Sequence, residues 1–175
     1  MSFRLTPTTS TTASLALGDA IAVALLEAKK FKADDFAKSH PGGKLGRRLN
    51  LRIEDVMKKG KELPIVLPSD SLAKTLIEIS SKGLGVALVI EKSTLKGIFT
   101  DGDLRRALNK KIDLLDFPIS KLMSKKAKTI TQSALATEAI KLMQQNQIYS
   151  LVVLNQKKQP KGLIRMHDLV EAGLV

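Results

Sequence analysis

The chain has 175 residues, a formal net charge of +12 and no cysteine, which excludes disulfides, thiolate metal sites and cysteine nucleophiles. Hydrophobic residues make up 43% of the sequence, as is typical of a globular rather than a disordered protein. The basic excess favours a polyanionic partner, but aromatic residues make up only 3% and the lysines are scattered, so nucleic acid is not an expected partner.

The N-terminal part contains an apolar segment, SLALGDAIAVALLEAKKF (Ser14–Phe31), which predicts a helix. Its apolar residues lie almost all round the helix, so we expect it to be buried in a larger body. The preceding TPTTSTT (Thr6–Thr12) predicts a hydroxyl-rich turn with donors for an anion at a helix start. The stretch SHPGG, which contains His40, predicts a further turn.

Nothing in the sequence predicts a signal peptide, because the N-terminus lacks a basic stretch followed by a continuous apolar core. The apolar stretches, such as Val86–Ile90 and Ser150–Leu154, are interrupted well short of a membrane span. We therefore expect a cytoplasmic protein with no membrane partner.

The rest of the chain consists of two copies of one sequence pattern. The first repeat runs from Ile53 to Leu108 and the second from Ile119 to Leu174. Aligned positions include Met57 and Met123, Leu72 and Leu135, Gly97 and Gly162, and Asp103 and Asp168.

Each repeat predicts the order strand, helix, two strands and helix. The helix after the first strand is predicted by apolar residues at helical spacing, and the two later strands by short apolar runs joined by polar turns. Neither repeat is long enough to bury a good core alone, so we expect an α+β pair that packs through its sheets. The predicted strands are Pro64–Leu67, Val86–Ile90 and Lys96–Thr100, then Lys128–Thr131, Ser150–Leu154 and Lys161–Arg165.

The first repeat closes with GIFTDGDLRRAL (Gly97–Leu108), in which small oxygen-bearing residues stand between a strand and a helix. Such residues cap helices, and on this segment alone capping is the favoured interpretation. The recurrence of the pattern in the second repeat, where RMHD replaces TDGD, favours a ligand-binding role.

This repeat, with its Met-bearing lead-in and its closing G-h-h-T-x-x-D motif, resembles a tandem pair of CBS domains from about residue 50 to the end of the chain. In that family the Thr or Ser and the Asp of the closing motif hold the ribose hydroxyls of a nucleotide. The resemblance therefore implies that Thr100 and Asp103 bind a ribose. A carboxylate suits that role because both of its oxygens accept hydrogen bonds.

The second repeat departs from the motif, because Arg165 stands where the hydroxyl is expected and only Asp168 matches. The resemblance thus implies two unequal half-sites and one ligand per pair. Arg165 is expected to meet a phosphate or carboxylate, while Asp168 is either the matching carboxylate or only a helix cap. His167 matches a family His-Asp pair near the cleft. Ser69 and Lys121, at the turn and the lead-in strand that flank the cleft, are further expected lining residues.

The motifs TPTTSTT, ALGDAIAVALLEA and SHPGGKLGRRL, followed by the CBS-like pair, resemble the end of the sugar-isomerase (SIS) domain of bacterial arabinose-5-phosphate isomerases. That resemblance implies an SIS remnant and linker at 1–49 and CBS domains at 50–112 and 113–175. It makes His40 the catalytic candidate, since imidazole titrates near working pH; the alternative is a histidine that orders the Pro-Gly-Gly turn. The resemblance also implies a homo-oligomer, typically a tetramer.

The family's other catalytic groups and its sugar-phosphate loop have no counterpart here, so the chain by itself is not expected to isomerise ribulose 5-phosphate to arabinose 5-phosphate. No HExxH or clustered metal ligands are present in the sequence, and no cofactor is required. Two hypotheses remain. One is a regulatory part of the isomerase whose pair binds CMP-Kdo, AMP or ATP. The other is a free-standing CBS module that binds an adenine nucleotide and has no catalytic activity.

Overall fold

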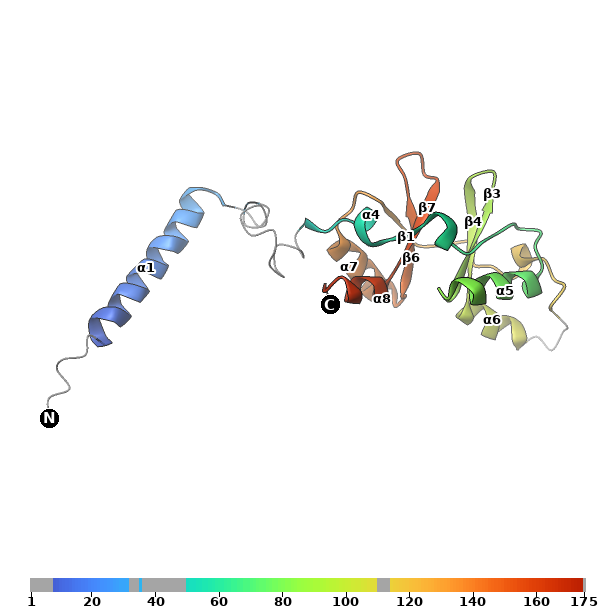
Figure 1. Cartoon of the computed structure of the whole chain (residues 1–175), viewed down its shortest axis with the longest axis horizontal. Helices are drawn as coiled ribbons and strands as arrows, with labels where there is room; N and C mark the ends of the chain where they lie inside the picture. The colour runs from blue at the N-terminus through green and yellow to red at the C-terminus, as the bar shows by residue number, and fades with distance from the viewer. Residues whose placement is uncertain (1–7, 32–34, 36–49, 110–113, 175) are drawn as a thin grey trace. The chain divides into compact units, whose positions relative to one another are not determined.

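The structure is a computed structural model that describes residues 8–31, 35, 50–109 and 114–174. The chain divides into two compact units, 1–49 and 50–175. In the first unit the main element is the helix α1 (Thr8–Ala28), drawn in blue in Figure 1. His40 lies outside the described residues.

Helix α1 differs from the sequence prediction at its start. Thr8–Thr12 form its first turns rather than a separate hydroxyl-rich turn. The hydroxyls of Thr11 and Thr12 each donate to the carbonyl oxygen of Thr8 at 2.9 Å, so both form hydrogen bonds within the helix. This local bonding explains how a threonine-rich segment is accommodated in a helix.

Every residue of α1 is exposed within the part of the chain that the structure describes. The expected burial is therefore not met there. The helix is also long and apolar enough to cross a membrane by length and composition, although core helices and signal sequences pass the same test. The sequence prediction overlooked this because it considered only uninterrupted apolar runs.

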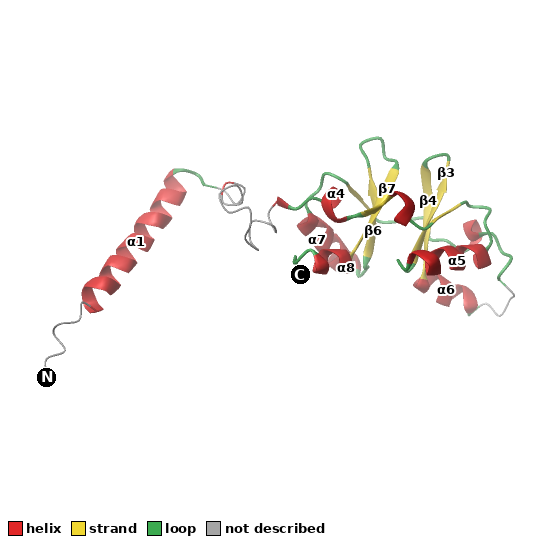
Figure 2. Cartoon of the chain, viewed as in Figure 1, coloured by secondary structure: helices red, strands yellow, loops and turns green. Residues whose placement is uncertain are grey.

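The second unit contains both repeats, and its helices and strands follow the predicted order (Figure 2). The elements of the first repeat are α4 (Ile53–Val56), β1 (Lys58–Lys59), η2 (Gly60–Glu62), β2 (Ile65–Val66), α5 (Leu72–Lys82), β3 (Val86–Glu91), β4 (Thr94–Thr100) and α6 (Asp101–Leu108). Those of the second are η3 (Ile119–Lys121), β5 (Thr129–Thr131), α7 (Ala136–Asn146), β6 (Ser150–Leu154), β7 (Pro160–Arg165) and α8 (Met166–Glu171).

The two repeats build matching sheets. One has the strand order β2-β3-β4 and the other β1-β7-β6-β5. In the first repeat β2 runs parallel to β3, which forms an antiparallel hairpin with β4. In the second repeat β5 likewise runs parallel to β6, which forms an antiparallel hairpin with β7, and β1 adds antiparallel to β7. A shared apolar cluster joins the sheets, to which β3 contributes Val86 and Leu88 and the second repeat Val152 and Leu163. The α+β pair is confirmed.

The lead-in segments are exchanged between the repeats, which the sequence did not predict. Strand β1 pairs with β7 of the second repeat, and Ser124 pairs with Ile98 of β4 in the first. Ile53 is fully buried in the core of the second repeat, and Ile119 in that of the first. In Figure 1 the blue-green segment with α4 and β1 lies against the orange-red strands β6 and β7.

Glycine makes this exchange sterically feasible. A Cβ atom at Gly97 would lie 2.6 Å from the backbone oxygen of Ser124 and 2.9 Å from Sδ of Met123. At Gly162 it would collide with Sδ of Met57 and lie 3.0 Å from the backbone oxygen of Lys58. The aligned Gly and Met residues are thus partners across the exchange.

We expect Gly97→Ala to lower the free energy of unfolding by about 1–3 kcal/mol, because the new methyl group meets backbone that must move. Urea unfolding of the full chain measures this. Gly102→Ala is the matched control, since its Cβ would have no neighbour closer than 3.5 Å, in ordinary contact. Equal destabilisation by the two substitutions would contradict the steric explanation.

Candidate functional site

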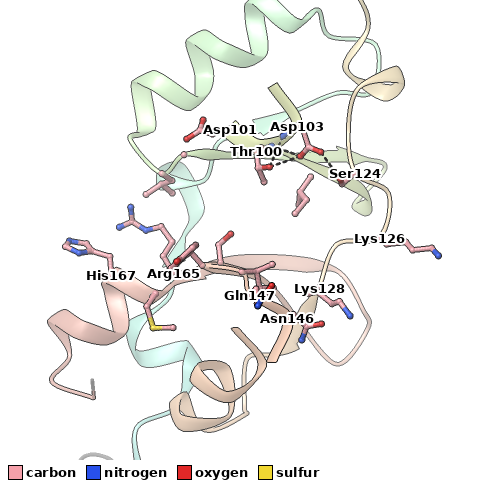
Figure 3. Close-up of a pocket in the computed structure, with 18 of the residues that line it drawn as sticks. Thr100, Asp101, Asp103, Ser124, Lys126, Lys128, Asn146, Gln147, Arg165 and His167 are labelled. Carbon is pink, nitrogen blue, oxygen red and sulfur yellow. Dashed lines mark hydrogen bonds between the residues drawn. The ribbon is translucent and has the colours of Figure 1, made fainter. Parts of the chain in front are cut away.

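A cavity of about 730 Å³ lies between the two repeats and is lined by both (Figure 3). The first repeat contributes Leu84 and Gly85, which precede β3, and Thr100–Asp103 at the start of α6. The second contributes the equivalent segments, 148–150 and 165–167. The closing motifs of both repeats therefore face one cavity, as the duplicated pattern predicts.

Asp103 is the buried acidic group of this cavity, and its side chain is only 4% exposed. Its Oδ2 accepts from the backbone N–H of Thr100 at 2.9 Å and from the Thr100 hydroxyl at 2.8 Å. Its Oδ1 accepts from Ser124 Oγ and from Arg106 Nη2, both at 2.7 Å. The Thr100 hydroxyl in turn accepts from the backbone N–H of Asp103 at 3.3 Å, which completes a capping box on α6.

These bonds set the charge state of Asp103. Burial alone would raise the pKa of its carboxyl, but the hydrogen bonds from Ser124, Thr100 and Arg106 outweigh burial and hold that pKa below its usual value. The carboxylate form is thereby favoured in the folded protein. Asp103 is thus an anionic acceptor, as ribose binding requires.

The lowered pKa of Asp103 makes the free energy of unfolding depend on pH in the acidic range. Because the pKa of Asp103 is lower in the folded than in the unfolded state, its contribution is present above about pH 4 and is lost as the pH falls through the folded-state value. We expect the free energy of unfolding of Asp103→Asn to change less between about pH 5 and pH 2 than that of the wild type.

Urea unfolding across that pH range measures the difference. Asp101→Asn is the matched control, because it removes an exposed carboxylate from the same helix turn. We expect it to keep the wild-type slope of stability against pH. A wild-type slope in Asp103→Asn would show that Asp103 does not contribute to the acid dependence.

Asp168 is equivalent to Asp103 but is enclosed differently. Its Oδ2 accepts from the backbone N–H of Arg165 at 2.9 Å and from Arg165 Nε at 3.2 Å, and its Oδ1 from Arg165 Nη2 at 2.7 Å. This pairing raises the pKa of the Arg165 guanidinium further above its usual value. Asp168 is 3% exposed and does not line the cavity, whereas Arg165 does.

A sequence model of the CBS domain matches residues 53–110 and 119–174, the same two repeats that enclose the cavity. The chain belongs to the CBS-domain family. Two solved CBS structures show the same fold: CBSX2 in complex with AMP and a CBS domain protein from Pyrobaculum aerophilum complexed with AMP. The first has a TM-score of 0.61 at 23% identity and covers 71% of this chain and 96% of its own. The second has a TM-score of 0.62 at 17% identity, with coverages of 71% and 100%.

The curated relatives are longer than this CBS chain. It is 52% identical over 172 residues to arabinose 5-phosphate isomerase KdsD of Pseudomonas aeruginosa, which covers 98% of this chain and 53% of that protein. The proteins of the same name from Francisella tularensis and Escherichia coli K12 are 48% and 45% identical and cover 97% and 98% of this chain. The chain spans about half the length of these relatives.

The remaining predicted residues of the CBS pair take different places. His167 lines the cavity at its edge, and its exposed ring points outwards, with Nε2 3.3 Å from a Glu171 oxygen (Figure 3). Lys121 lines a smaller cavity of about 300 Å³ together with Asp103 and Arg106, and its amine lies 5.9 Å from the centre of the Phe117 ring. Ser69 is exposed in a turn and lines neither cavity.

The CBS cavity also has lining residues that the sequence analysis missed. They include Lys126 and Lys128 on the segment before β5, and Asn146 and Gln147 at the end of α7. Gln147 has a φ of 52°, and the equivalent Gly83 a φ of 65°, so the two helices end in the same left-handed turn. The equivalence of these two helix ends is the feature of the repeat that relates Gln147 to the cavity-lining segment after Gly83. Among the described residues, no group of three or more His, Asp or Glu side chains is placed to hold a metal ion.

Proposed function

We propose that this chain is the C-terminal regulatory part of an arabinose 5-phosphate isomerase, and that its CBS pair binds a nucleotide or nucleotide-sugar. Support for the enzyme comes from the KdsD relatives, which match nearly all of this chain. Support for the ligand class comes from the AMP held by two proteins of the same fold. The isomerase activity, the role of His40, the homo-oligomeric assembly and the cytoplasmic location belong to this proposal.

The observation that carries the proposal is the chemistry of the CBS cavity. A nucleotide has a flat apolar base, a ribose that donates hydrogen bonds and an anionic group. The cavity offers apolar walls, including Leu84, Ile98 and Ile148, and the buried carboxylate of Asp103, with the exposed residues Lys126 and Lys128 on one side. Its volume of about 730 Å³ falls in the range of small-molecule sites.

Ribose binding at Asp103 requires one existing bond to be replaced. Both oxygens already accept two hydrogen bonds each, which uses the capacity of a carboxylate. Arg106 is the donor released most readily, because its side chain is 69% exposed and an exposed ion pair contributes little to stability. A ribose hydroxyl would then take its place on Oδ1.

Two kinds of ligand fit this proposal, CMP-Kdo and an adenine nucleotide. Lys126 and Lys128 are two cations on one side of the cavity, and both the phosphate of AMP and the phosphodiester and carboxylate of CMP-Kdo are anionic partners for them. An adenine nucleotide remains the second candidate, because the two similar folds were solved with AMP. It is also the ligand of the alternative function, a CBS module without catalytic activity.

Calorimetric titration of the full chain with CMP-Kdo, CMP, AMP and ATP tests the ligand. Binding of at least one of them with a dissociation constant below about 1 mM is expected, since weaker binding would correspond to less than about 4 kcal/mol. If none of the four binds in that range, the CBS cavity is not a nucleotide site. Turnover of ribulose 5-phosphate by this chain alone would contradict its assignment as a regulatory part.

A further inference from the structure

The two closing motifs occupy equivalent positions in the fold but make different bonds. Thr100 pairs with Val86 at the start of β3, and Arg165 pairs with Ser150 at the start of β6. Each is followed three residues later by the buried aspartate of its repeat. A direct comparison of the two half-sites is therefore justified, residue by residue.

The cavity is open to one half-site and closed to the other. Asp103 lines it, whereas the equivalent Asp168 does not, although both carboxylates are almost fully buried. The side chain that covers Asp168 is Arg165, which is only 20% exposed. Arg165 also reaches into the first repeat, where its Nη1 donates a weak bond of 3.4 Å to the carbonyl oxygen of Gly83.

The guanidinium presents the donor pattern that a ribose would present. Nε and Nη2 of Arg165 donate in parallel to the two oxygens of Asp168, at 3.2 and 2.7 Å. Two neighbouring ribose hydroxyls offer a carboxylate the same pair of donors. Arg165 is part of the same chain as Asp168. It therefore competes with a ribose for the Asp168 carboxylate without the entropy cost that a free ligand has on association.

We propose that Arg165 fills the second half-site from within, so that the CBS pair holds one nucleotide, at Asp103, and a single substitution of Arg165 opens a second site at Asp168. This inference rests on the proposed nucleotide binding. It assigns Arg165 a regulatory role in setting stoichiometry instead of a direct contact with the ligand.

The variant that tests the inference is Arg165→Thr, which copies the first repeat. Thr100 gives Asp103 two donors, its backbone N–H and its hydroxyl. A threonine at 165 would give Asp168 the same two, so the buried carboxylate stays paired and α8 stays capped. Alanine at 165 would leave only the backbone N–H.

Calorimetric titration of the full chain with AMP is the experiment. We expect one site in the wild type, two in Arg165→Thr, and one again in Arg165→Thr combined with Asp168→Ala. Two sites in the wild type, no added site in Arg165→Thr, or an added site that survives Asp168→Ala would each overturn the inference.

The same titrations separate this inference from the proposed function. If the wild type binds none of CMP-Kdo, CMP, AMP and ATP but Arg165→Thr binds one equivalent of AMP that depends on Asp168, nucleotide binding at Asp103 is wrong and the role of Arg165 stands. If neither protein binds AMP, the role of Arg165 is wrong as well, since its removal opens nothing.

A measurement on the wild type covers the case in which the variant does not fold. The Nε–H of Arg165 is expected to stay protected from exchange with solvent at saturating AMP, because the guanidinium remains on Asp168. Loss of that protection on AMP binding would overturn the inference.

Discussion

Asp103→Ala is expected to weaken nucleotide binding by about ten- to a hundredfold, equivalent to roughly 1.5–3 kcal/mol for a lost hydrogen bond to a charged acceptor. The carboxylate is 4% exposed, and its pKa is held below the usual value, so it is a charged acceptor in a poorly hydrated place. Calorimetry with whichever of CMP-Kdo, CMP, AMP or ATP binds the wild type measures the change.

The matched control is Asp168→Ala, which removes the equivalent carboxylate that Arg165 already covers. We expect its nucleotide affinity to stay within about threefold of the wild type, a difference below 1 kcal/mol. Asp103→Asn serves as a second variant, because alanine also removes the bond that the Asp103 side chain contributes to the capping box of α6. Thermal unfolding of all three variants reports whether the fold is kept. Wild-type affinity in a folded Asp103→Ala protein would mean that the TDGD junction is only a helix cap.

Ile53→Ala is expected to cost about 2–5 kcal/mol of unfolding free energy, as does truncation of other fully buried aliphatic residues. Ile53 belongs to the first repeat in sequence but has no exposed surface in the core of the second, among Ile130, Met143 and Leu169. The cavity left by its side chain would therefore lie in the second repeat.

Urea unfolding measures the size of the loss, and amide hydrogen exchange shows where it falls. Protection should fall first in β5–β7 for Ile53→Ala and first in β2–β4 for Ile119→Ala, because Ile119 is buried in the first repeat. Ile77→Ala is the control, since Ile77 is 71% exposed on α5 and its loss should leave stability nearly unchanged. Loss of protection in the first repeat alone after Ile53→Ala would contradict the exchange of lead-ins.

Much of the fold follows from local patterns. The apolar runs Val86–Ile90 and Ser150–Leu154 form strands β3 and β6. Both runs are short and rich in valine, a β-branched residue that favours strands. Ser71 caps α5 through its hydroxyl, and Gly83 ends it with a φ of 65°, as those residue types predict. The remaining strands were predicted from the internal repeat, since each strand of one repeat predicts an equivalent strand in the other.

The missed features depend on contacts between segments far apart in the sequence. The lead-in of each repeat packs against the sheet of the other repeat. The sequence around Met57 does not indicate which of the two sheets Met57 contacts. Lys126 and Lys128 read as solvated surface, because only the folded pair places them on the cavity wall. The pairing of Arg165 with Asp168 required the rotamer of a long side chain, which a motif alignment does not provide.

The exchanged lead-in also decides how the second unit is attached to what precedes it. Its first residues are fixed to the second repeat, where Leu51 accepts from the N–H of Ala136, and Ile53 donates to the carbonyl of Ala134. The covalent exit of the CBS pair towards the N-terminus thus starts from the repeat that comes last in the sequence. The lead-in is therefore held by hydrogen bonds to the second repeat and by the chain between β1 and β2 to the first. The N-terminal end of the pair is thus coupled by non-covalent contacts to the repeat whose aspartate Arg165 covers.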